Sequence, residues 1–410
     1  MALGDMDHHN KYMVLALKIA FERMGKTSPN PPVGAVIVKN KTIVSTGGTG
    51  PYGTSHAEAA AIAGAGVDLT GADMYVSLEP CNHYGKTPPC TAAIIKAGIG
   101  RVFIPMVDPN PLVSGRGAAE LENAGIMVQF MEDMADPAVD IIRHFKKYIV
   151  RHKPFVVSKS AITLDGRIAA KSGDSRWISS EYTRYLIHKL RAKADAVIVG
   201  KNTFIHDNPA LNVRFDSFDK AVRNYFRESA PAMSGRDNFF LRSLFMEEIA
   251  DVRMPLRVVI GLPDTIDLTS NIFSDSNYIF FEKRSAVDRL VRSKRGLAKE
   301  LDAIQLVPVD ADTPAEEAGA VCDDLYSRGI VYAVIEGGGR VAGSFFDAGE
   351  IDQFFYCITP KIAGNGIPCL AGVGVDLIRD ALRLRDVSIM TVQDDIVYNG
   401  YASPYHVEMM

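Results

Sequence analysis

The stretch Thr54–Cys90, TSHAEAAAIAGAGVDLTGADMYVSLEPCNHYGKTPPC, decides the fold of the N-terminal half of the chain. It opens with His56-Ala57-Glu58, continues through an alanine-rich segment typical of a helix, and then enters an apolar run at residues 74–78. A loop rich in proline and glycine follows and contains Cys81 and Cys90. Because α/β sheets place ligands at the carboxyl ends of their strands, the stretch predicts an α/β domain with a ligand site there.

One imidazole, two thiolates and a nearby carboxylate are the groups that a hydrolytic zinc site needs. His56, Cys81 and Cys90 would supply three ligands and leave a fourth position for water. Zinc lowers the pKa of bound water from about 15.7 to about 7, so hydroxide exists at neutral pH. Glu58 is well placed to take a proton from that water and pass it to a leaving amine. His-x-Glu followed by Pro-Cys and a second cysteine is the signature of zinc deaminases of nucleobases and nucleosides.

Simpler interpretations of the same residues stay open at this point. Ser55-x-x-Glu58 is also a capping box, and taken alone the pair favours a helix cap. The cysteines could be ordinary buried residues, or could close a structural zinc site with both His56 and His83. Structural sites more often place about two to four residues between their cysteines, whereas eight residues separate Cys81 from Cys90. The combination of motifs therefore favours a catalytic site.

The wide spacing of the cysteines brings a more specific resemblance. The loop from Glu79 to Cys90 resembles the zinc loop of the bifunctional riboflavin-biosynthesis deaminase/reductases, and Thr27–Gly34 resembles that family's substrate loop. The resemblance implies a cytidine-deaminase-like layered α/β domain. It also implies that Asn30, His83 and Lys86 contact the substrate, with the lysine suited to a phosphate.

By sequence alone, these three substrate residues have plainer interpretations, since Asn30 suits a turn and the other two suit a solvated loop. One position departs from the family. A histidine that lines the deaminase pocket usually stands seven residues before the zinc histidine, and this chain has Thr49 there. We therefore expect one substrate hydrogen bond to be weaker or to come from another group.

The bulk properties of the chain argue against several other classes of protein. Its 410 residues suffice for two or three domains, and 47% hydrophobic and 23% charged residues are ordinary for globular proteins. A net charge of −4 argues against a nucleic-acid partner. The N-terminus has no basic or apolar signal region, and no apolar run has the length of a membrane span. Three of the five cysteines lie outside the zinc loop, and this odd remainder suits a reducing cytoplasm.

Helical and strand patterns alternate through the first 150 residues, which predicts a sheet with helices on its faces. Helices are expected at 10–24, from 56, and at 91–96, 118–123 and 137–150, and strands near 33–38, 43–44, 74–78, 101–107 and 126–130. The zinc site would lie between two helix N-termini, whose dipoles favour thiolates. Because Pro154 cannot continue a helix, we place a domain boundary near residue 151.

The second domain, residues 151–410, carries an independent resemblance to the same family. The domain begins with an expected strand at 155–161, and the matching motifs extend from Lys159 through Arg214. This part resembles the family's reductase domain, which has a dihydrofolate-reductase-like α/β fold and uses NADPH. A turn with three glycines, 337–339, separates an apolar strand from a helix, where backbone N–H groups could approach a pyrophosphate. It is not a Gly-x-Gly-x-x-Gly fingerprint, and such a turn alone is more often a plain connection.

The resemblance assigns roles in the second domain residue by residue. It places Lys159 at the reaction centre. The implied NADPH contacts are Ala161, Trp177, Thr203, Asp207, Gly338, Gly339, Arg340, Val341, Ala342, Gly343 and Ser344. The implied substrate contacts are Ser175, Arg191, Leu211, Arg214 and Glu336. Plainer roles as core or solvated side chains exist for each of these, but two arginines near one site suit a phosphate ester.

Two features of the second domain depart from the family. Gly261-Leu262 stand where an Asp-Ser pair usually touches NADPH, so we expect that contact to differ. Residues 215–254 form a longer segment than the family's usual short link, and their aromatic content argues against a disordered linker. We expect an ordered insertion that is helical around 236–251 and lies at an oligomer interface.

The resemblance therefore implies a bifunctional enzyme that uses zinc and NADPH and acts on a phosphorylated pyrimidine. We also expect that it binds neither nucleic acid nor membrane and forms a homo-oligomer. The first domain would remove the ring amino group, and the second would reduce the ribosyl group to ribityl. Two rivals are a zinc nucleoside or nucleobase deaminase with an unrelated second domain, and a non-catalytic scaffold with structural zinc. A fourth protein ligand, most readily His83, would favour the scaffold.

Overall fold

The computed structural model describes residues 3–229, 231–235, 238–249, 251–293, 301 and 303–402. The chain forms two compact units, one comprising Met1–His152 with Asn238–Ser243 and the other Lys153–Asp237 with Leu244–Met410. Both units are mixed α/β, so the predicted fold class is confirmed. Across the described ranges, no helix has both the length and the apolar character that crossing a bilayer requires.

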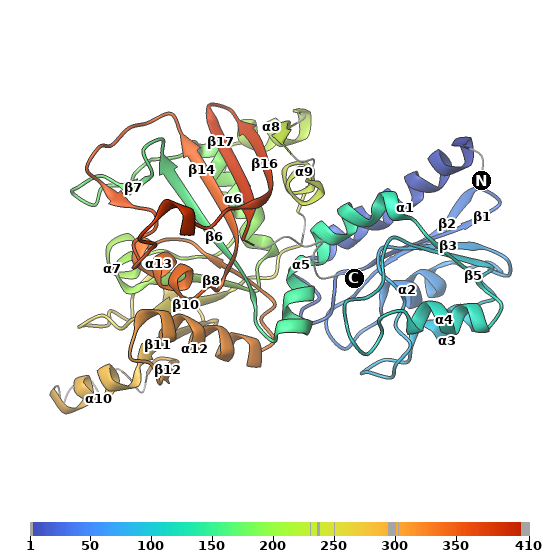
Figure 1. Ribbon diagram of the computed structural model, residues 1–410, viewed down its shortest axis with the longest axis horizontal. Coiled ribbons are helices and arrows are strands. Elements are labelled where there is room, and N and C mark those ends of the chain that lie inside the picture. The colour runs from blue at the N-terminus through green and yellow to red at the C-terminus, as the bar shows by residue number, and fades with distance from the viewer. Residues whose placement is uncertain are drawn as a thin grey trace. The chain divides into compact units, whose positions relative to one another are not determined.

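The first unit is built on a five-stranded sheet in the order β2-β1-β3-β4-β5. Its strands are β1 (Gly34–Lys39), β2 (Thr42–Gly48), β3 (Asp73–Val76), β4 (Arg101–Ile104) and β5 (Met127–Phe130). Its helices are α1 (Leu3–Arg23), α2 (Ala57–Gly64), α3 (Cys90–Lys96), α4 (Arg116–Asn123) and α5 (Ala135–Arg151). Figure 1 shows α1 and α5 on one side of this sheet and α2, α3 and α4 on the other. The β3-β4-β5 part is parallel, so the carboxyl ends of these strands meet at one edge.

The second unit is built on a ten-stranded sheet in the order β12-β11-β10-β8-β13-β6-β14-β17-β16-β9. Its strands are β6 (Phe155–Thr163), β8 (Ala196–Gly200), β9 (Ala232–Gly235), β10 (Leu256–Ile260), β11 (Tyr278–Lys283), β12 (Leu306–Val309), β13 (Tyr332–Ile335), β14 (Ile351–Thr359), β16 (Arg385–Val392) and β17 (Asp395–Tyr401). A separate pair joins β7 (Arg167–Ala169) to β15 (Ile367–Pro368). The strands from β12 to β14 run parallel and β17, β16 and β9 run antiparallel.

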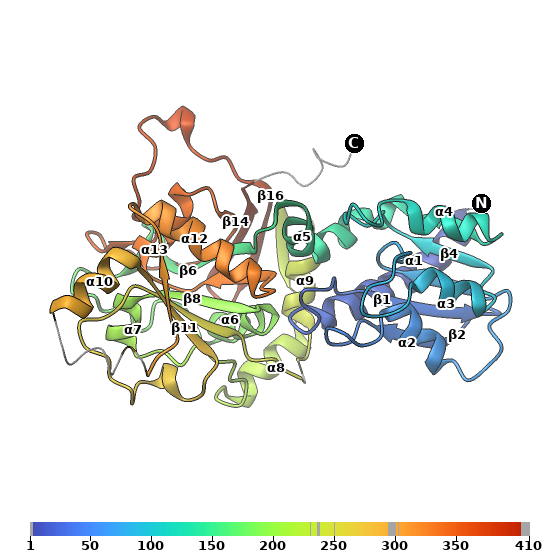
Figure 2. The same ribbon diagram turned by 90° about the horizontal axis from the view of Figure 1, so that it is seen from below.

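Helices cover both faces of the ten-stranded sheet. The described helices of this unit are α6 (Glu181–Lys193), α7 (Lys201–Asp207), α8 (Lys220–Glu228), α10 (Arg284–Ser293), α12 (Pro314–Ser327) and α13 (Gly339–Asp347). The short helix α9 (Phe239–Met246) is divided between the two units, since its first residues belong to the first. Figure 2 shows α12 and α13 on one side of the sheet and α6, α7 and α8 on the other.

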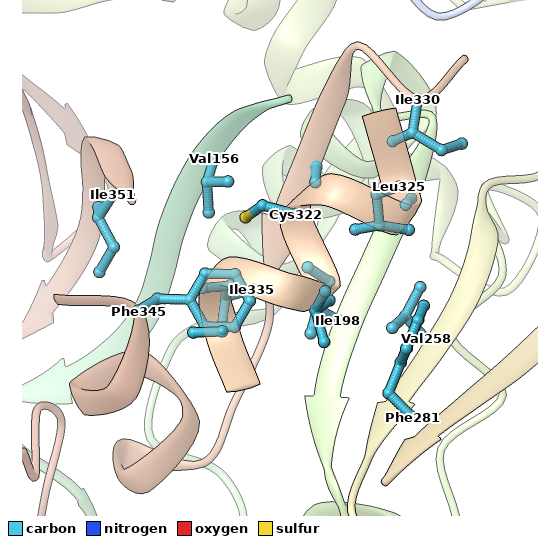
Figure 3. Packing of buried hydrophobic residues seen from close by; sticks show 14 of the residues in the cluster. Val156, Ile198, Val258, Phe281, Cys322, Leu325, Ile330, Ile335, Phe345 and Ile351 are labelled. Atoms are coloured by element: carbon cyan, nitrogen blue, oxygen red, sulfur yellow. The ribbon is translucent and has the colours of Figure 1, made fainter. Parts of the chain in front are cut away.

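The core of the second unit follows the alternation of side chains along its strands. In β8, Ala196 and Ile198 lie in one buried cluster, and Val197 and Val199 lie in another on the opposite face. Figure 3 shows the first cluster, in which strand residues such as Ile198 face Leu325 of α12 and Phe345 of α13. Burial on both faces explains why β8 reads as a continuous apolar run.

The segment 215–254 contains α8, β9 and α9, and α9 is shorter than the helix expected around 236–251. Of that expected helix, residues 239–246 are helical, and residues 236, 237 and 250 lie outside the described residues. Strand β9 pairs with β16 at the edge of the ten-stranded sheet. The local sequence does not predict this strand, because it is four residues long and only its pairing with β16 defines it.

Candidate functional site

Three side chains of the first unit converge on one point. The Nδ1 atom of His56 lies 3.5 Å from Sγ of Cys81 and 3.4 Å from Sγ of Cys90. Among the described residues, these three are the group of His, Cys, Asp and Glu side chains whose ligand atoms all lie within 4.8 Å of one another. His83 is outside this group. The structure therefore brings together the predicted trio, and the part of the chain that it describes offers no fourth protein ligand at this point.

Local backbone structure places each member of the trio. His56 is the N-cap of α2, with φ −72° and ψ 165°, and its side chain makes no capping hydrogen bond. Cys90 is the first residue of α3, and Cys81 lies in the loop after β3. The capping-box interpretation of Ser55 and Glu58 is therefore wrong, because the helix begins one residue later than such a box requires. An extended N-cap instead directs the imidazole away from its own helix.

Electrostatics in the site favour one negative charge on the sulfur pair. A hydrogen bond from Cys90 lowers the pKa of Cys81 to about 4, and the same hydrogen bond together with burial raises the pKa of Cys90. Burial raises the pKa of Glu58 to about 7. A carboxyl group that titrates near neutrality can both accept and return a proton at physiological pH.

The donor set fits a zinc ion. Two thiolates and one imidazole are ligands that zinc prefers, and three protein ligands are the usual number in catalytic sites. The other ring nitrogen of His56, Nε2, lies 3.4 Å from Oγ1 of Thr87. A partner of this kind fixes the tautomer of a metal-binding histidine. Our sequence analysis did not single out Thr87, although it lies inside the zinc loop.

A pocket of about 330 Å³ opens beside the trio between α2 and α3. His56, Cys90, Thr87 and the apolar residues Ala59 and Pro88 are among its lining residues. Asn30, His83 and Lys86 are not. The pocket gives small molecules access to two of the three ligands.

The predicted substrate residues of the first unit occupy two loops. Asn30 is half-buried, and its backbone N–H donates to Thr27 O at 3.0 Å. In the zinc loop, Nδ1 of His83 and Oδ1 of Asn82 are buried atoms for which the described residues offer no hydrogen-bond partner. Lys86 is exposed, with Nζ 4.0 Å from the ring centre of Tyr52. Buried polar atoms without partners are rare, so these two atoms fit contacts to a ligand.

Thr49 has a structural role in place of the family's histidine. Its Oγ1 accepts from the backbone N–H of Val33 at 3.1 Å, and its own N–H donates to Val33 O at 2.9 Å. These bonds hold the chain just after the loop that carries Asn30. The hydroxyl is thus already used within the protein.

Glu79, the first residue of the zinc loop, anchors a second loop. One carboxylate oxygen accepts from the backbone N–H groups of Asp108 and Gly115, both at 2.9 Å, and the other accepts from Ala118 at 3.0 Å. A side chain at Gly117 would have its Cβ 2.0 Å from Pro80 O, so only glycine allows α4 to approach the zinc loop this closely. The sequence shows Glu79 beside Cys81, but its three partners lie far along the chain.

In the second unit, Glu336 at the end of β13 lies between two cations. Its carboxylate accepts both Nε and Nη2 of Arg191 at 2.8 Å, and Nζ of Lys159 lies 3.9 Å from Oε2. Burial opposes its ionisation, but the charge of Arg191 and then that of Lys159 outweigh burial and lower the pKa of Glu336 to about 2. The structure therefore brings together three residues that the sequence assigned to the reaction centre and the substrate.

The NADPH residues predicted from the sequence are distributed over several elements of the second unit. Ala161 lies on β6, Asp207 ends α7, and α13 begins at Gly339, with Gly338 as its N-cap. Gly337 and Gly338 have φ values of 137° and 84°, and Cβ atoms built on them would lie 3.4 and 3.6 Å from Oγ1 of Thr203. This turn therefore needs glycine and lies against the start of α7.

Two cationic side chains, Arg184 and Lys361, contact Trp177. It is 64% exposed, the guanidinium carbon of Arg184 lies 4.3 Å from its ring centre, and Nζ of Lys361 donates to Trp177 O at 2.5 Å. An exposed aromatic ring fixed in this way presents a flat surface to a ligand. The sequence analysis missed Arg184 and Lys361.

The remaining predicted substrate residues differ in exposure. Ser175 is half-buried and Arg214 is exposed, whereas the side chain of Leu211 is buried in the core beside Phe204. Only the backbone of Leu211, with φ 51°, is therefore available to a ligand. Gly261, which stands where the family usually has an aspartate, contacts the aliphatic part of Lys201. A Cβ at this position would lie 3.1 Å from Cδ of Lys201.

Comparison with known proteins gives two family matches. Residues 154–398 match the RibD C-terminal domain, and residues 6–106 match the cytidine and deoxycytidylate deaminase zinc-binding region. The chain is 33% identical to the riboflavin biosynthesis protein RibD of Aquifex aeolicus over 94% of this chain and 96% of that protein. It is 31% identical to RibD of Escherichia coli over 94% of this chain and 97% of that protein.

Solved structures give the same result. A diaminohydroxyphosphoribosylaminopyrimidine deaminase/5-amino-6-(5-phosphoribosylamino)uracil reductase from Thermotoga maritima matches with a TM-score of 0.76 and 29% identity, covering 97% of this chain and 99% of that one. RibD from Acinetobacter baumannii matches with a TM-score of 0.74 and 27% identity, covering 97% and 99% of the two chains.

Proposed function

This chain belongs to the RibD family of riboflavin biosynthesis proteins, and from this premise we propose how its residues carry out the family's two reactions. It is a bifunctional enzyme with a zinc-dependent deaminase and an NADPH-dependent reductase. We assign the deaminase to residues 1–150 and the reductase to residues 151–410. The first removes the ring amino group of diaminohydroxyphosphoribosylaminopyrimidine, and the second reduces the ribosyl group of the product to ribityl.

The convergence of His56, Cys81 and Cys90 beside a buried carboxylate carries the deaminase assignment. These three residues would hold zinc, which would supply an activated water molecule for attack on the amino-bearing carbon. Glu58 accepts the proton of that water and returns it to the departing amine, which leaves as ammonia. Asn30 and His83 orient the pyrimidine, and Lys86 binds the phosphate as a mobile point charge.

In the reductase, Lys159 and Glu336 frame the ribose, and Arg191 holds Glu336 in place through its two-pronged pair. NADPH supplies the hydride when bound. The glycine turn at 337–339 and residues Arg340–Ser344 bind its pyrophosphate, with Ala161, Trp177, Thr203 and Asp207 as further contacts. Arg214, with Ser175 and the backbone of Leu211, contacts the phosphorylated substrate.

The bifunctional assignment has a direct assay. The pyrimidine substrate is supplied with and without NADPH. Ammonia release is expected in both cases, and NADPH oxidation only when deaminated product is formed or supplied. Release of ammonia without any NADPH oxidation on added product would contradict the second activity.

Metal content tests the zinc ligands. Freshly purified protein is expected to hold about one zinc ion per chain, and Cys90→Ser should lower both zinc content and ammonia release, because one of three ligands is lost. Cys369→Ser is the matched control, since this cysteine lies outside the zinc loop. Metal analysis that finds zinc unchanged in the Cys90 variant would remove this residue from the ligand set.

We also propose that the protein is cytoplasmic and forms a homo-oligomer. Cys357 and Cys369, which lie outside the zinc loop, are free thiols, which suits a reducing compartment. Segment 361–384 of the second unit exposes several apolar side chains, with Ile362, Val373 and Ile378 at 76%, 94% and 90% exposure. We place the subunit interface at these exposed apolar side chains.

Light scattering tests the oligomer. The unaltered protein is expected to have at least the mass of a dimer, and the double change Val373→Asp with Ile378→Asp should shift it toward the monomer. Ile43→Asp, which adds the same charge at an exposed apolar residue of the first unit, should leave the mass unchanged. A monomeric unaltered protein would disprove the proposal.

A further inference from the structure

One face of α6 holds the short loop 211–214 at two points. Nη1 of Arg191 donates to Asn212 O at 2.5 Å, and Nδ1 of His188 accepts the backbone N–H of Arg214 at 3.0 Å. Residues three apart on a helix face the same way, so both bonds come from the same side of α6. The loop that carries Arg214 is therefore held by one rigid element.

The chemical state of His188 suits this hydrogen bond. The residue is 7% exposed, and burial followed by the charge of Arg191 lowers its pKa to about 3. A neutral imidazole has one donor and one acceptor nitrogen, and the N–H of Arg214 identifies Nδ1 as the acceptor. The ring therefore stays neutral in the physiological pH range, and Nδ1 remains an acceptor there.

Phenylalanines from the segment 215–254 hold the ring of His188 in place. Phe218 meets it edge-on with ring centres 5.2 Å apart, and Phe215 lies 6.5 Å away. One helical turn earlier, Tyr185 contacts Phe218 at 5.3 Å and Phe226 at 5.0 Å. Such pairs contribute beyond the apolar area that they bury, so the position of His188 depends on this segment.

The same segment is attached to α6 by two buried lysines. Nζ of Lys189 donates to Phe245 O at 2.6 Å, and Nζ of Lys193 pairs with Glu247 at 2.7 Å. Figure 2 shows α8, which carries Phe226, beside α6. These residues of the segment are therefore packed against the helix that carries the site residue Arg191.

Arg214 itself remains available to a ligand. Its residue is exposed, its Nη1 donates to Oδ1 of Asn212, and its carbonyl accepts from Oγ of Ser217 at 2.9 Å. A guanidinium on a fixed backbone loses little conformational entropy when it binds a phosphate.

We propose that His188 is a positioning residue of the reductase, which holds Arg214 through its backbone N–H so that the guanidinium can bind the substrate phosphate. In the same proposal, the segment 215–254 is the support that keeps His188 in place. The inference rests on the proposed contact between Arg214 and the phosphorylated substrate.

Steady-state kinetics of the reductase on already deaminated substrate test the proposal. His188→Leu replaces the imidazole by an apolar side chain of similar size and so removes the acceptor. It should raise KM for the deaminated substrate about threefold to tenfold, which corresponds to one hydrogen bond, with kcat and KM for NADPH changed less than about twofold. His188→Asn retains an oxygen acceptor near the position of Nδ1 and should restore most of the substrate KM.

Two further variants separate this inference from the proposed function. If Arg214→Ala leaves the substrate KM unchanged, the proposed contact of Arg214 is wrong. If Arg214→Ala raises KM and His188→Leu does not, the inference about His188 is overturned on its own. In the Arg214→Ala background, His188→Leu should add no further rise in KM, and a full additional rise would show that the two residues act separately.

A merely structural role of His188 has a different signature. It would lower kcat, raise KM for NADPH and reduce thermal stability together, without rescue by His188→Asn, and this pattern would also overturn the proposal. Should His188→Leu fail to fold, Phe218→Leu carries the test, because it removes the ring contact but keeps an apolar side chain. A rise in substrate KM alone supports the proposal, and an unchanged substrate KM in folded Phe218→Leu overturns the role of the segment.

Discussion

Replacing Glu58 by glutamine is expected to slow ammonia release by at least about 10²–10⁴-fold. Glutamine has nearly the same size and still forms hydrogen bonds, but it cannot accept and return a proton. The carboxyl group is buried, and its pKa of about 7 allows both steps at neutral pH. Ammonia release should be measured together with zinc content and NADPH oxidation in the same preparation.

Zinc content and reduction of already deaminated substrate should be unchanged in this variant. A cap contributes on the order of 1 kcal/mol to stability, so the loss of a capping group alone would leave deamination almost intact. The structure shows no side-chain cap by His56 at the N-cap position of α2. Near-normal ammonia release by a zinc-loaded Glu58→Gln protein would falsify the proton-shuttle role.

Replacing Lys159 or Glu336 by alanine is expected to reduce NADPH oxidation by about 10²-fold or more, since the removal of one electrostatic group from a reaction centre has effects of this size. Glu336→Ala should act more severely, because it leaves Arg191 and Lys159 without their buried counter-charge. Breaking a buried ion pair destabilises proteins by about 3–5 kcal/mol, so its thermal stability should also fall.

Ammonia release serves as the internal control for both variants, because the deaminase has its own residues in the other unit. Lys159→Ala should retain nearly normal thermal stability, because Glu336 keeps its two hydrogen bonds to Arg191. This variant therefore separates loss of chemistry from loss of structure. A parallel fall of both activities in a folded Lys159 variant would contradict the assignment of two separate sites.

The zinc site could be predicted from the sequence because its chemistry is encoded locally. His56, Glu58 and the cysteines lie within one stretch, and a helix start and a strand end explain their convergence. The partners of Glu79 could not be predicted, because they are backbone N–H groups at residues 108, 115 and 118. Backbone groups leave no mark in the sequence pattern.

For the reductase centre, the sequence predicted which residues take part but not how they pair with one another. Arg191 and Glu336 were both predicted to contact the substrate, yet in the structure each is the closest charged partner of the other. They lie 145 positions apart, on α6 and after β13, so only the tertiary fold shows that they form a pair. The helix expected at 236–251 was too long for the same reason, because tertiary contacts decide how this segment divides.

Strand β9 has a consequence for the solubility of the protein. It pairs with Ser388–Thr391 of β16, whose outer backbone groups would otherwise form an open sheet edge. Exposed edges invite pairing with other chains and hence aggregation. Gly235, with φ 84° and no room for a Cβ beside Val387 O, lets the end of this short strand lie close to β16. A shortened protein without residues 215–254 would lose this protection, and its inclusion bodies could be mistaken for a failure of the core to fold.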